Sequence, residues 1–360
     1  MSARVLTLSF AEADAFGQFV DTHLAQGRAV VPASDERPAP DDLRRMLATL
    51  GVKPTTGLRR RLAEWIANPD NPLAARVMVN RVWQHHFGRG IVRSVDNFGR
   101  AGDAPADPAL LDWLASEFVS SGWSLKKLHK TIVMSSAYRM SSAADNPQAV
   151  AIDPGNETTW RQNLRRLDAE ALRDSILAIS GQLNTQMEGR GVFPALSSDV
   201  LETQSKPGHG WETSDAASRS RRSIYIYIKR TLMFPLFEAF DYTNTAEAMG
   251  ERPVTTVAPQ ALMLLNSRFL AEQAERLADR IAASAGDSPD RQIDQLFQSA
   301  LQRLPTPLEQ EIARDLLAGQ QRRFREAAAS GKEASVDPER LALQSLCLAI
   351  LNLNEFLYVD

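Results

Sequence analysis

Helical spacing of apolar residues is the feature of this sequence that most restricts its fold. The segments LRRRLAEWIAN at 58–68, ALLDWLASEFVSSG at 109–122 and LRRLDAEALRDSILAISGQL at 164–183 place apolar side chains every three or four residues. That period belongs to one face of an α-helix, so each segment predicts an amphipathic helix. The clearest alternation of a strand lies in IYIYI at 224–228. We therefore predict a mainly α, multi-helix globular protein with a small β element near 190–230.

The predicted strand at 224–228 has bulky side chains on both faces, so we expect it to be covered on two sides. A short strand at Gly191–Leu196 is its expected partner, and residues 184–222 otherwise form a surface excursion. Further helices are expected in segments that again show helical spacing or helix-starting residues. They are residues 1–30, a short helix ending at Gly51, the segment from Pro72 to Phe87, SLKKLHKTIVMSSAY at 124–138 with Ser124 as N-cap, 259–283, 293–304, and two helices after Pro305.

Breaks in the helical pattern divide the chain. VPASDERPAP at 31–40 holds three prolines and is typical of a linker. We therefore expect residues 1–57 to be a helical lead-in with a Pro-rich linker, and residues 58–360 to form the main domain. A polar break at 141–159 is a candidate boundary within that domain.

Composition excludes several classes of protein. A formal net charge of -3 does not suit a dedicated nucleic-acid binder, which normally carries a strongly basic face. With a single cysteine, Cys347, the chain cannot form an internal disulfide or a multi-cysteine metal site, and it has no CxxCH for attaching c-type haem. We expect Cys347 to be a small buried side chain, because it lies in the apolar run LALQSLCLAILNL. We expect no cofactor within this chain.

No apolar run approaches the roughly 20 residues that a membrane-spanning helix needs. The opening MSARVLTLSFAEADAFG is too short in its apolar part and too acidic for a secretory signal. On the residues alone we expect a protein without a membrane span.

Polar residues gather between Arg76 and Gly99, where helical periodicity stops at Gly88 and Gly90. His85 and His86 are the candidate catalytic groups of this segment. Adjacent residues on a helix point about 100° apart, so at most one of them joins a shared site, and we predict no metal site built on the pair. The alternative is a structural hydrogen bond at the helix end.

Arginine and asparagine side chains of the same region predict an anion-binding site for sulfate, phosphate or carboxylate groups. The candidate ligand-binding residues here are Arg76, Asn80, Arg81, Arg93, Asn97 and Arg100, with Arg89 beside them. The alternative is that the arginines pair with acids such as Asp96 and Glu117.

Acidic residues provide two further candidates. Asp96, Asn97, Asp103 and Asp107 offer oxygen ligands suited to calcium, although their spacing is not that of an EF-hand, and they are equally typical of turns and helix caps. GHGWETSD at 208–215 combines His209, Trp211 and Glu212, which suits sugar binding by Trp211 or acid–base chemistry by His209, Glu212 and Asp96. A mobile surface loop is the alternative for this segment. No GxSxG motif or glycine-rich phosphate loop is present.

The chain resembles the planctomycete-specific domain one family, a domain of unknown function, over about residues 58–360. The matching strings are RVMVNRVWQHHFGRGIV with DNFG, LLDWLASEF with GWSLKKLHKTIVMSSAYR, RLDAEALRDSILAISGQLN, RRSIYIYIKR, APQALMLLNSRF and LNLNEFLYVD. The resemblance implies an exported or cell-surface protein in which this domain follows another planctomycete-specific domain and a cytochrome-c-like haem domain. It establishes no catalytic residue, and the signal, haem motif and upstream domain are not found in this sequence.

Two hypotheses follow for function. The first is an accessory or binding module of an exported cell-surface assembly, which binds an anionic glycan or a haem-bearing partner domain. The alternative is a hydrolase acting on polysaccharide, with His85 or His86, Asp96, and His209 or Glu212 in one cleft. Electron transfer would require a cofactor supplied by another chain.

Overall fold

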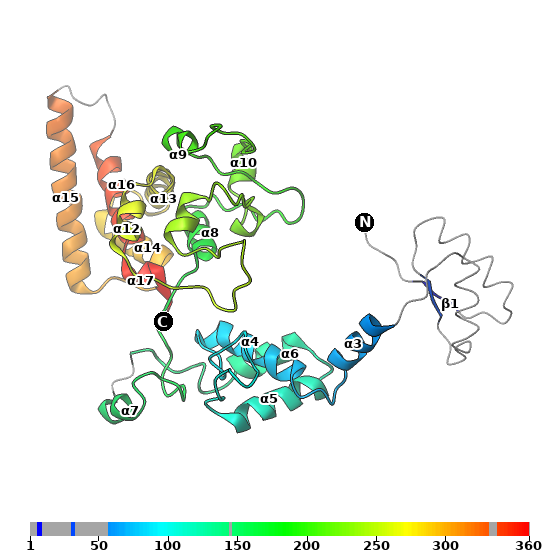
Figure 1. The fold of residues 1–360 in the computed structure, drawn as a ribbon. Coiled ribbons are helices and arrows are strands. Elements are labelled where there is room, and N and C mark those ends of the chain that lie inside the picture. The colour runs from blue at the N-terminus through cyan, green and yellow to red at the C-terminus, as the bar shows by residue number, and fades with distance from the viewer. Residues whose placement is uncertain (1–5, 9–29, 33–56, 144–145, 331–336, 360) are drawn as a thin grey trace. The chain divides into compact units, whose positions relative to one another are not determined.

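The computed structural model describes residues 6–8, 30–32, 57–143, 146–330 and 337–359. The chain divides into two compact units, Met1–Asn71 and Pro72–Asp360. Most of the described residues are helical (Figure 1), which confirms the predicted mainly α fold. Among the described helices, none has the length and apolar composition needed to cross a membrane.

Two short strands occur in the described residues near the start of the first unit. Strand β1 (Leu6–Leu8) pairs in parallel with β2 (Val30–Pro32). The helix predicted over residues 1–30 is therefore wrong at these positions, where the backbone pairs with another strand instead of coiling. The rest of that prediction, the linker beyond residue 32 and the short helix ending at Gly51 lie outside the described residues.

Helix α3 (Leu58–Ile66) ends the first unit and confirms the helix predicted at 58–68. Gly57 precedes it with a left-handed φ of 69°, a conformation that glycine adopts without steric cost. Its apolar residues Leu58, Leu62 and Trp65 are all exposed.

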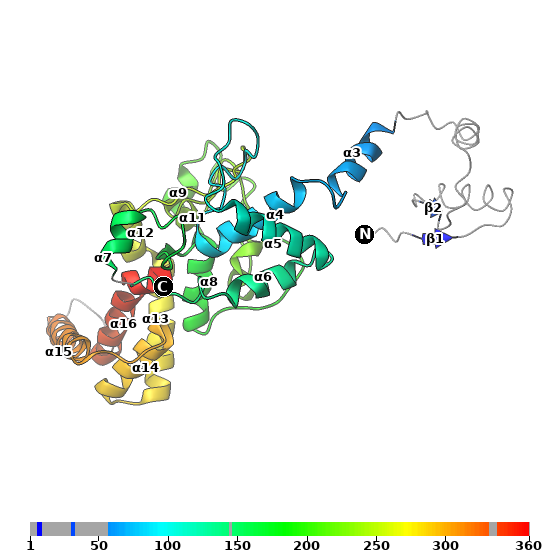
Figure 2. The ribbon, with the colours of Figure 1, turned by 90° about the horizontal axis from the view of Figure 1, so that it is seen from below.

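The first hydrophobic core of the second unit lies among helices α4 (Ala74–Phe87), α5 (Pro108–Ser120) and α6 (Leu125–Val133), which lie together in Figures 1 and 2. Side-chain caps begin two of these helices. Asp107 accepts from the Leu110 amide at 2.9 Å, and Ser124 accepts from the Lys127 amide at 3.4 Å, as predicted for Ser124. The buried core residues are Ala75, Val79, Val82, Trp83, Phe87, Ile91, Val92, Leu111, Leu114, Ala115, Phe118, Leu128 and Ile132.

A second hydrophobic core is built by the remaining helices of this unit. They are α8 (Ala169–Ile179), α11 (Pro235–Ala239), α12 (Ala258–Asn266), α13 (Arg268–Ala285), α14 (Pro289–Leu301), α15 (Pro307–Ala329), α16 (Pro338–Leu351) and α17 (Asn354–Leu357). Leu277, Ile293 and Cys347 are fully buried in it. Burial raises the pKa of the Cys347 thiol well above its usual range, so this cysteine is an unreactive core residue as predicted.

Two helix boundaries differ from the predictions. The helix expected from residue 164 begins only at Ala169, because Arg165–Arg166 form strand β3 and pair antiparallel with β4 (Tyr358–Val359). The helix expected over 259–283 is two helices, since the Ser267 side chain caps the start of α13 by accepting from the Leu270 amide.

The strand predicted at 224–228 is wrong. Ser223–Tyr225 form a 3-10 turn, η1, and only Ile226 makes a bridge, which runs parallel to Val192. The expected partner segment at Gly191–Leu196 is thus the right neighbour, but a single bridge replaces a ladder. Ile224 is 74% exposed, so the alternating side chains are not covered on two faces.

Buried arginines hold the surface segment at residues 184–222 in place. This segment also contains the short helices α9 (Ser198–Glu202) and α10 (Ala216–Arg219). Arg173 of α8 is 2% exposed and donates to the Arg221 carbonyl at 3.0 Å and to the Ser223 hydroxyl at 3.2 Å. Burial lowers the pKa of its guanidinium to about 10, which still leaves it charged at neutral pH. Arg221 in turn donates to the Arg190 carbonyl at 3.2 Å.

Candidate functional site

The end of α4 is fixed by an asparagine and two glycines. Asn80 is fully buried and exchanges two hydrogen bonds with the backbone of Val92, at 2.9 and 2.8 Å. Gly88 ends the helix with a φ of 77°, and at Gly90 a Cβ atom would lie 2.4 Å from the Val92 carbonyl oxygen. Asn80, Gly88 and Gly90 therefore stabilise the turn by which the chain leaves α4, and a side chain at Gly90 would displace that turn.

His86, in that last turn, contacts a second histidine from α6. Its Nε2 lies 2.8 Å from Nδ1 of His129, and its ring meets the Tyr138 ring edge-on at a centroid distance of 5.4 Å. Burial, reinforced by the neighbouring His129, lowers the pKa of His86 below its ordinary value. Both causes favour the neutral form of the His86 ring, and one of the two facing nitrogens donates to the other.

A hollow of about 290 Å³ adjoins His86, and we call it the cationic hollow. It is lined by His86, Phe87, Tyr138, Arg139, Met140, Gln162, Asn163, Arg165 and Val359. Arg139 follows α6, and Arg165 comes from β3, which the pairing with β4 holds in place.

Both guanidinium groups of the cationic hollow bond to main-chain carbonyls. Arg165 donates to the His85 carbonyl, and Arg139 donates to the Ser135 carbonyl at 3.4 Å. In the described part of the chain, neither has a carboxylate within ion-pair distance, and no carboxylate side chain lines the hollow. Both side chains are exposed, so an ion from solvent can reach them.

The loop at residues 153–163 borders the hollow and is held by its own side chains. The Asp153 carboxylate accepts from the amides of Glu157 and Thr158, both at 2.9 Å, and these bonds lower its pKa. Asn156 sits at a left-handed φ of 52° and donates to Asn163 Oδ1 at 3.0 Å. Non-glycine residues in this conformation cost energy and persist only where neighbours enforce them.

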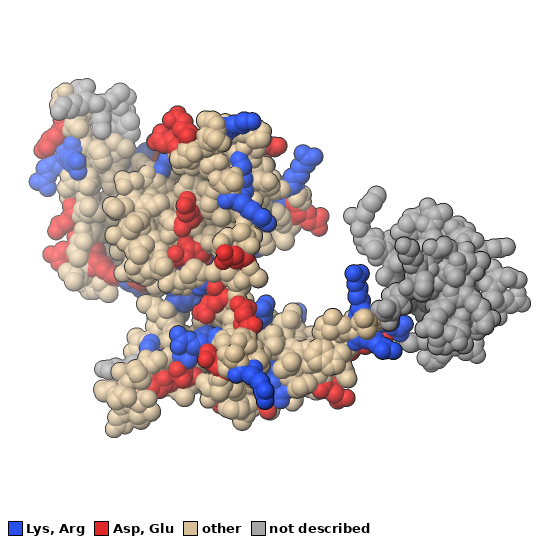
Figure 3. Space-filling model, viewed as in Figure 1, with Lys and Arg blue, Asp and Glu red and all other residues tan. Residues whose placement is uncertain are grey.

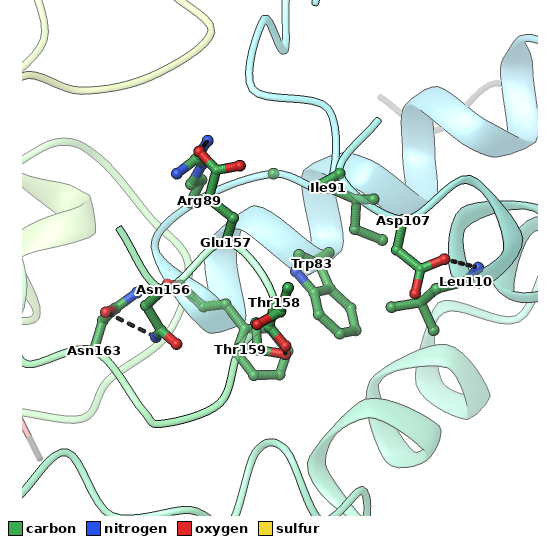
Figure 4. Close-up of a pocket in the computed structure, with 13 residues that line it drawn as sticks. Trp83, Arg89, Ile91, Asp107, Leu110, Asn156, Glu157, Thr158, Thr159 and Asn163 are labelled. Carbon is green, nitrogen blue, oxygen red and sulfur yellow. Dashed lines mark hydrogen bonds and ion pairs between the residues drawn. The ribbon is translucent and has the colours of Figure 1, made fainter. Parts of the chain in front are cut away.

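A smaller pocket of about 120 Å³, the tryptophan pocket, lies on the other side of Phe87 and Asn163, which line both cavities. Figure 4 shows Trp83 at its centre, with Arg89 and Glu157 together at its rim. The Arg89–Glu157 ion pair is 2.8 Å long and joins the turn after α4 to the 153–163 loop. Because these charges satisfy each other, the tryptophan pocket attracts an anion less than the cationic hollow does.

Most of the arginines predicted to bind an anion have other surroundings. Arg76 pairs with Asp112 at 2.7 Å, and Arg81 pairs with Asp96 at 3.6 Å. Arg93 lines an open groove beside Arg89 and Asp103, and Arg100 is exposed on the same loop. Positive and negative side chains of this unit are interspersed on the face shown in Figure 3. The alternative of structural pairing thus describes Arg76 and Arg81.

The predicted polar ligands Asn80 and Asn97 make local hydrogen bonds. Asn80 holds Val92 as described, and Asn97 accepts from the Gly99 amide at 3.0 Å. Asp107 caps α5. Within the described residues, no group of three or more His, Cys, Asp or Glu side chains is placed to hold a metal ion. The turn and cap chemistry expected as the alternative to calcium describes Asn97 and Asp107.

The 208–215 segment belongs to the excursion over the second core. Trp211 is buried, donates to the Pro194 carbonyl at 3.1 Å and meets Phe193 edge-on. His209 and Glu212 are exposed, and neither lines the cationic hollow. The described contacts therefore do not bring these residues together with His86, and the indole of Trp211 is a packing group.

Sequence reasoning missed His129, Arg139, Arg165 and Asn163. All four lie outside the Arg76–Gly99 segment in the sequence, and tertiary packing brings them to His86. One available signal was the polar run after α6, where Tyr138 and Arg139 follow the last apolar turn.

This arrangement defines a helical domain with two cores and a cationic hollow at the junction of α4, α6 and β3. The chain belongs to the PSD1 family, described as a protein of unknown function (DUF1553), whose sequence profile matches residues 58–317. Neither the curated proteins nor the solved structures contain a match to this chain.

Proposed function

We propose that this protein is a binding module that recognises the anionic groups of a sulfated or carboxylated glycan in the cationic hollow. The observation that carries the proposal is the convergence of Arg139, Arg165 and His86 on one cavity without a carboxylate among its described lining residues. Gln162 and Asn163 add amide donors at the same place.

Electrostatics supports an anion as the ligand. A guanidinium group forms two parallel hydrogen bonds to a carboxylate or sulfate, and such charge-assisted bonds are about twice as strong as neutral ones. Two guanidinium groups with no acidic partner in the described residues also repel each other. A bound anion would reduce this electrostatic repulsion. By the same reasoning, Arg76 and Arg81 are weaker candidates, because Asp112 and Asp96 already neutralise them.

The family context supports the setting of this module. Membership of the PSD1 family, together with the sequence resemblance, favours an exported or cell-surface assembly in which an upstream planctomycete-specific or cytochrome-c-like domain is the partner. On that proposal the module anchors the assembly to an anionic polysaccharide.

A polysaccharide hydrolase is the second candidate, and the contact between His86 and His129 at 2.8 Å is the observation that favours it. A histidine held by a second imidazole is able to transfer a proton to or from a reacting group. Release of reducing ends from anionic polysaccharide, lost in H86Q and kept in H85Q, would support it.

Binding of a heparin oligosaccharide tests the first proposal. Isothermal titration should give saturable binding to the wild-type protein at low salt. Replacing both guanidinium groups in R139Q/R165Q should weaken it by about 100-fold or more, since each lost charge-assisted bond is worth about 1.5–3 kcal/mol. R100Q is the matched control, because Arg100 is an exposed arginine outside the hollow. Equal losses in R100Q and R139Q/R165Q would reduce the effect to net charge and contradict the proposal.

A further inference from the structure

The two imidazoles at the cationic hollow form a pair that shares protons. His86 Nε2 and His129 Nδ1 are 2.8 Å apart, and their rings are inclined by 70° with centroids 5.0 Å apart. At this separation one nitrogen must donate and the other must accept. The pair therefore holds one proton on the line between the two nitrogens and cannot place a second one there without breaking the contact.

Among the described residues, the groups that line the hollow with His86 or act on its charge are positive or neutral. They are His85 on α4, His129 on α6, Tyr138 and Arg139 after α6, and Arg165 on β3. Gln162 and Asn163 from the bordering loop are uncharged. An additional proton on His86 therefore meets repulsion from Arg165 and His129 while the hollow holds solvent alone.

We propose that binding of an anion in the cationic hollow is coupled to the uptake of one proton by the His86–His129 pair. This inference rests on the proposed function, because the anion that binds there is the same one. His86 lines the hollow, so its positive charge in the protonated state faces the anion directly. His129 acts as a positioning residue, since it holds the His86 ring and accepts or donates the shared hydrogen bond.

Burial and like charge make the sign of the coupling definite. They hold the pKa of His86 below its ordinary value in the free protein, and a nearby anion favours the protonated form and raises that pKa. At a pH between the pKa of His86 in the free protein and its pKa in the anion-bound protein, binding of the anion takes up a proton. Affinity should therefore fall by about tenfold per pH unit as the pH rises through this range.

Inorganic sulfate is a suitable probe, because it does not titrate between about pH 5 and 8, the range in which histidine does. The dissociation constant should be measured by NMR titration across that range. The chain has only five histidines, so the ring resonances of His86 and His129 can be assigned by substitution and their charge followed directly. We expect the His86 ring to become protonated on saturation with sulfate at a pH where the free protein holds it neutral.

Three variants separate coupling from simple packing. H86Q should bind sulfate with an affinity that no longer depends on pH in this range. H129Q should keep the pH dependence but shift it to higher pH, because one cause of the lowered pKa of His86 is removed. H85Q is the matched control on the same helix, because its ring is exposed and outside the hollow. His85 is the smallest cause of the lowered pKa of His86, so H85Q should keep the pH dependence with a smaller shift than H129Q.

The outcomes distinguish this inference from the proposed function. Saturable sulfate binding that is lost in R139Q/R165Q, with the same affinity at every pH, would overturn the proton coupling and leave the binding site standing. An H86Q variant with the wild-type pH dependence would also overturn the coupling. No saturable binding at any pH would overturn both.

Discussion

Asn80 shows at the scale of one residue why a polar side chain in a recognisable segment need not face a ligand. It is a predicted ligand-binding residue, yet its amide is fully buried and satisfies both backbone groups of Val92. A buried backbone group without a partner is costly, so the turn after α4 requires a side chain that can donate and accept at once. The sequence shows the residue type but not which groups surround it.

Replacing Asn80 should therefore destabilise the fold. N80A leaves the Val92 amide and carbonyl unpaired, and we expect a loss of about 2–3 kcal/mol in the free energy of unfolding, measured with urea. N97A is the control, because Asn97 is exposed and makes a local turn bond, and it should cost less than about 1 kcal/mol. Equal effects of the two substitutions would contradict this role for Asn80.

An acidic residue of α15 provides a prediction about pH. The Arg303 guanidinium, bonded to Glu309 at 2.6 and 2.8 Å, holds the pKa of that carboxyl at about 2. Since the folded pKa lies below the unfolded one, the ionised carboxylate stabilises the fold above the ordinary glutamate pKa of about 4.3, and this contribution is lost as the pH falls towards 2.

Urea unfolding of E309Q at several pH values checks this prediction. At neutral pH, E309Q should be less stable than the wild type by about 1 kcal/mol, a value reduced for the partial exposure of the pair. The difference should shrink as the pH falls from about 4 to 2. E311Q, an exposed glutamate on the same helix, should show no such trend. A constant difference for E309Q at all pH values would count against the ion pair as its cause.

At the scale of elements, local patterns predict the helices well and the strand badly. Helices α3, α4, α5 and α6 lie where apolar spacing places them, and side-chain caps begin α5 and α6. These signals act within one or two turns, so they can be read from the sequence. The alternation at 224–228 does not form a strand because distant residues hold this part of the chain. Arg173 donates to the Arg221 carbonyl and the Ser223 hydroxyl just before the segment, and Val192 forms a single bridge with Ile226. The β3–β4 pair joins residues almost 200 positions apart, which no local pattern can anticipate.

The two glycines after α4 should respond differently to the same substitution. G88A places alanine at a left-handed φ with open space around it and should cost about 1 kcal/mol. G90A places a Cβ atom 2.4 Å from the Val92 carbonyl oxygen and 2.7 Å from Asn80 Nδ2, so the turn itself must move. We expect a loss of about 3 kcal/mol or more in urea unfolding. A G90A variant as stable as G88A would show that the turn yields without cost.

The same glycine turn links stability to the candidate site. Gly90 and Arg89 line the tryptophan pocket, and Phe87 lines both cavities, so a displaced turn also changes the walls of the candidate site. The candidate site could be predicted only in part for this reason. His86 was identified from its segment, whereas Arg139 and Arg165 join it through packing of α6 and through a strand paired with the end of the chain.

At the scale of the whole molecule, residues 72–360 hold two separate clusters of buried apolar residues. Hydrogen bonds join their elements, such as those of Arg165 with the His85 carbonyl and of Gln84 with the Gly250 carbonyl at 3.5 Å. Polar contacts of this kind couple two cores weakly compared with shared apolar burial. The cationic hollow lies among these contacts, so it depends on both cores being folded.

Two unfolding transitions are therefore expected in calorimetry of the protein. L114A, which opens a cavity in the first core, should lower one transition temperature, and L277A in the second core should lower the other. Each substitution should remove about 2–5 kcal/mol from its own core. A single transition that both variants shift equally would show that the two cores unfold together.

Anion binding in the cationic hollow is tested most directly by a crystal structure of the protein soaked in selenate. Selenate is a heavier analogue of sulfate, and anomalous scattering reveals its position. We predict a selenate ion in the cationic hollow, bonded to Arg139 and Arg165 and within hydrogen-bond distance of His86, and no ion there in crystals of R139Q/R165Q. Selenate bound elsewhere on the molecule, with the hollow holding only water at the same concentration, would contradict it.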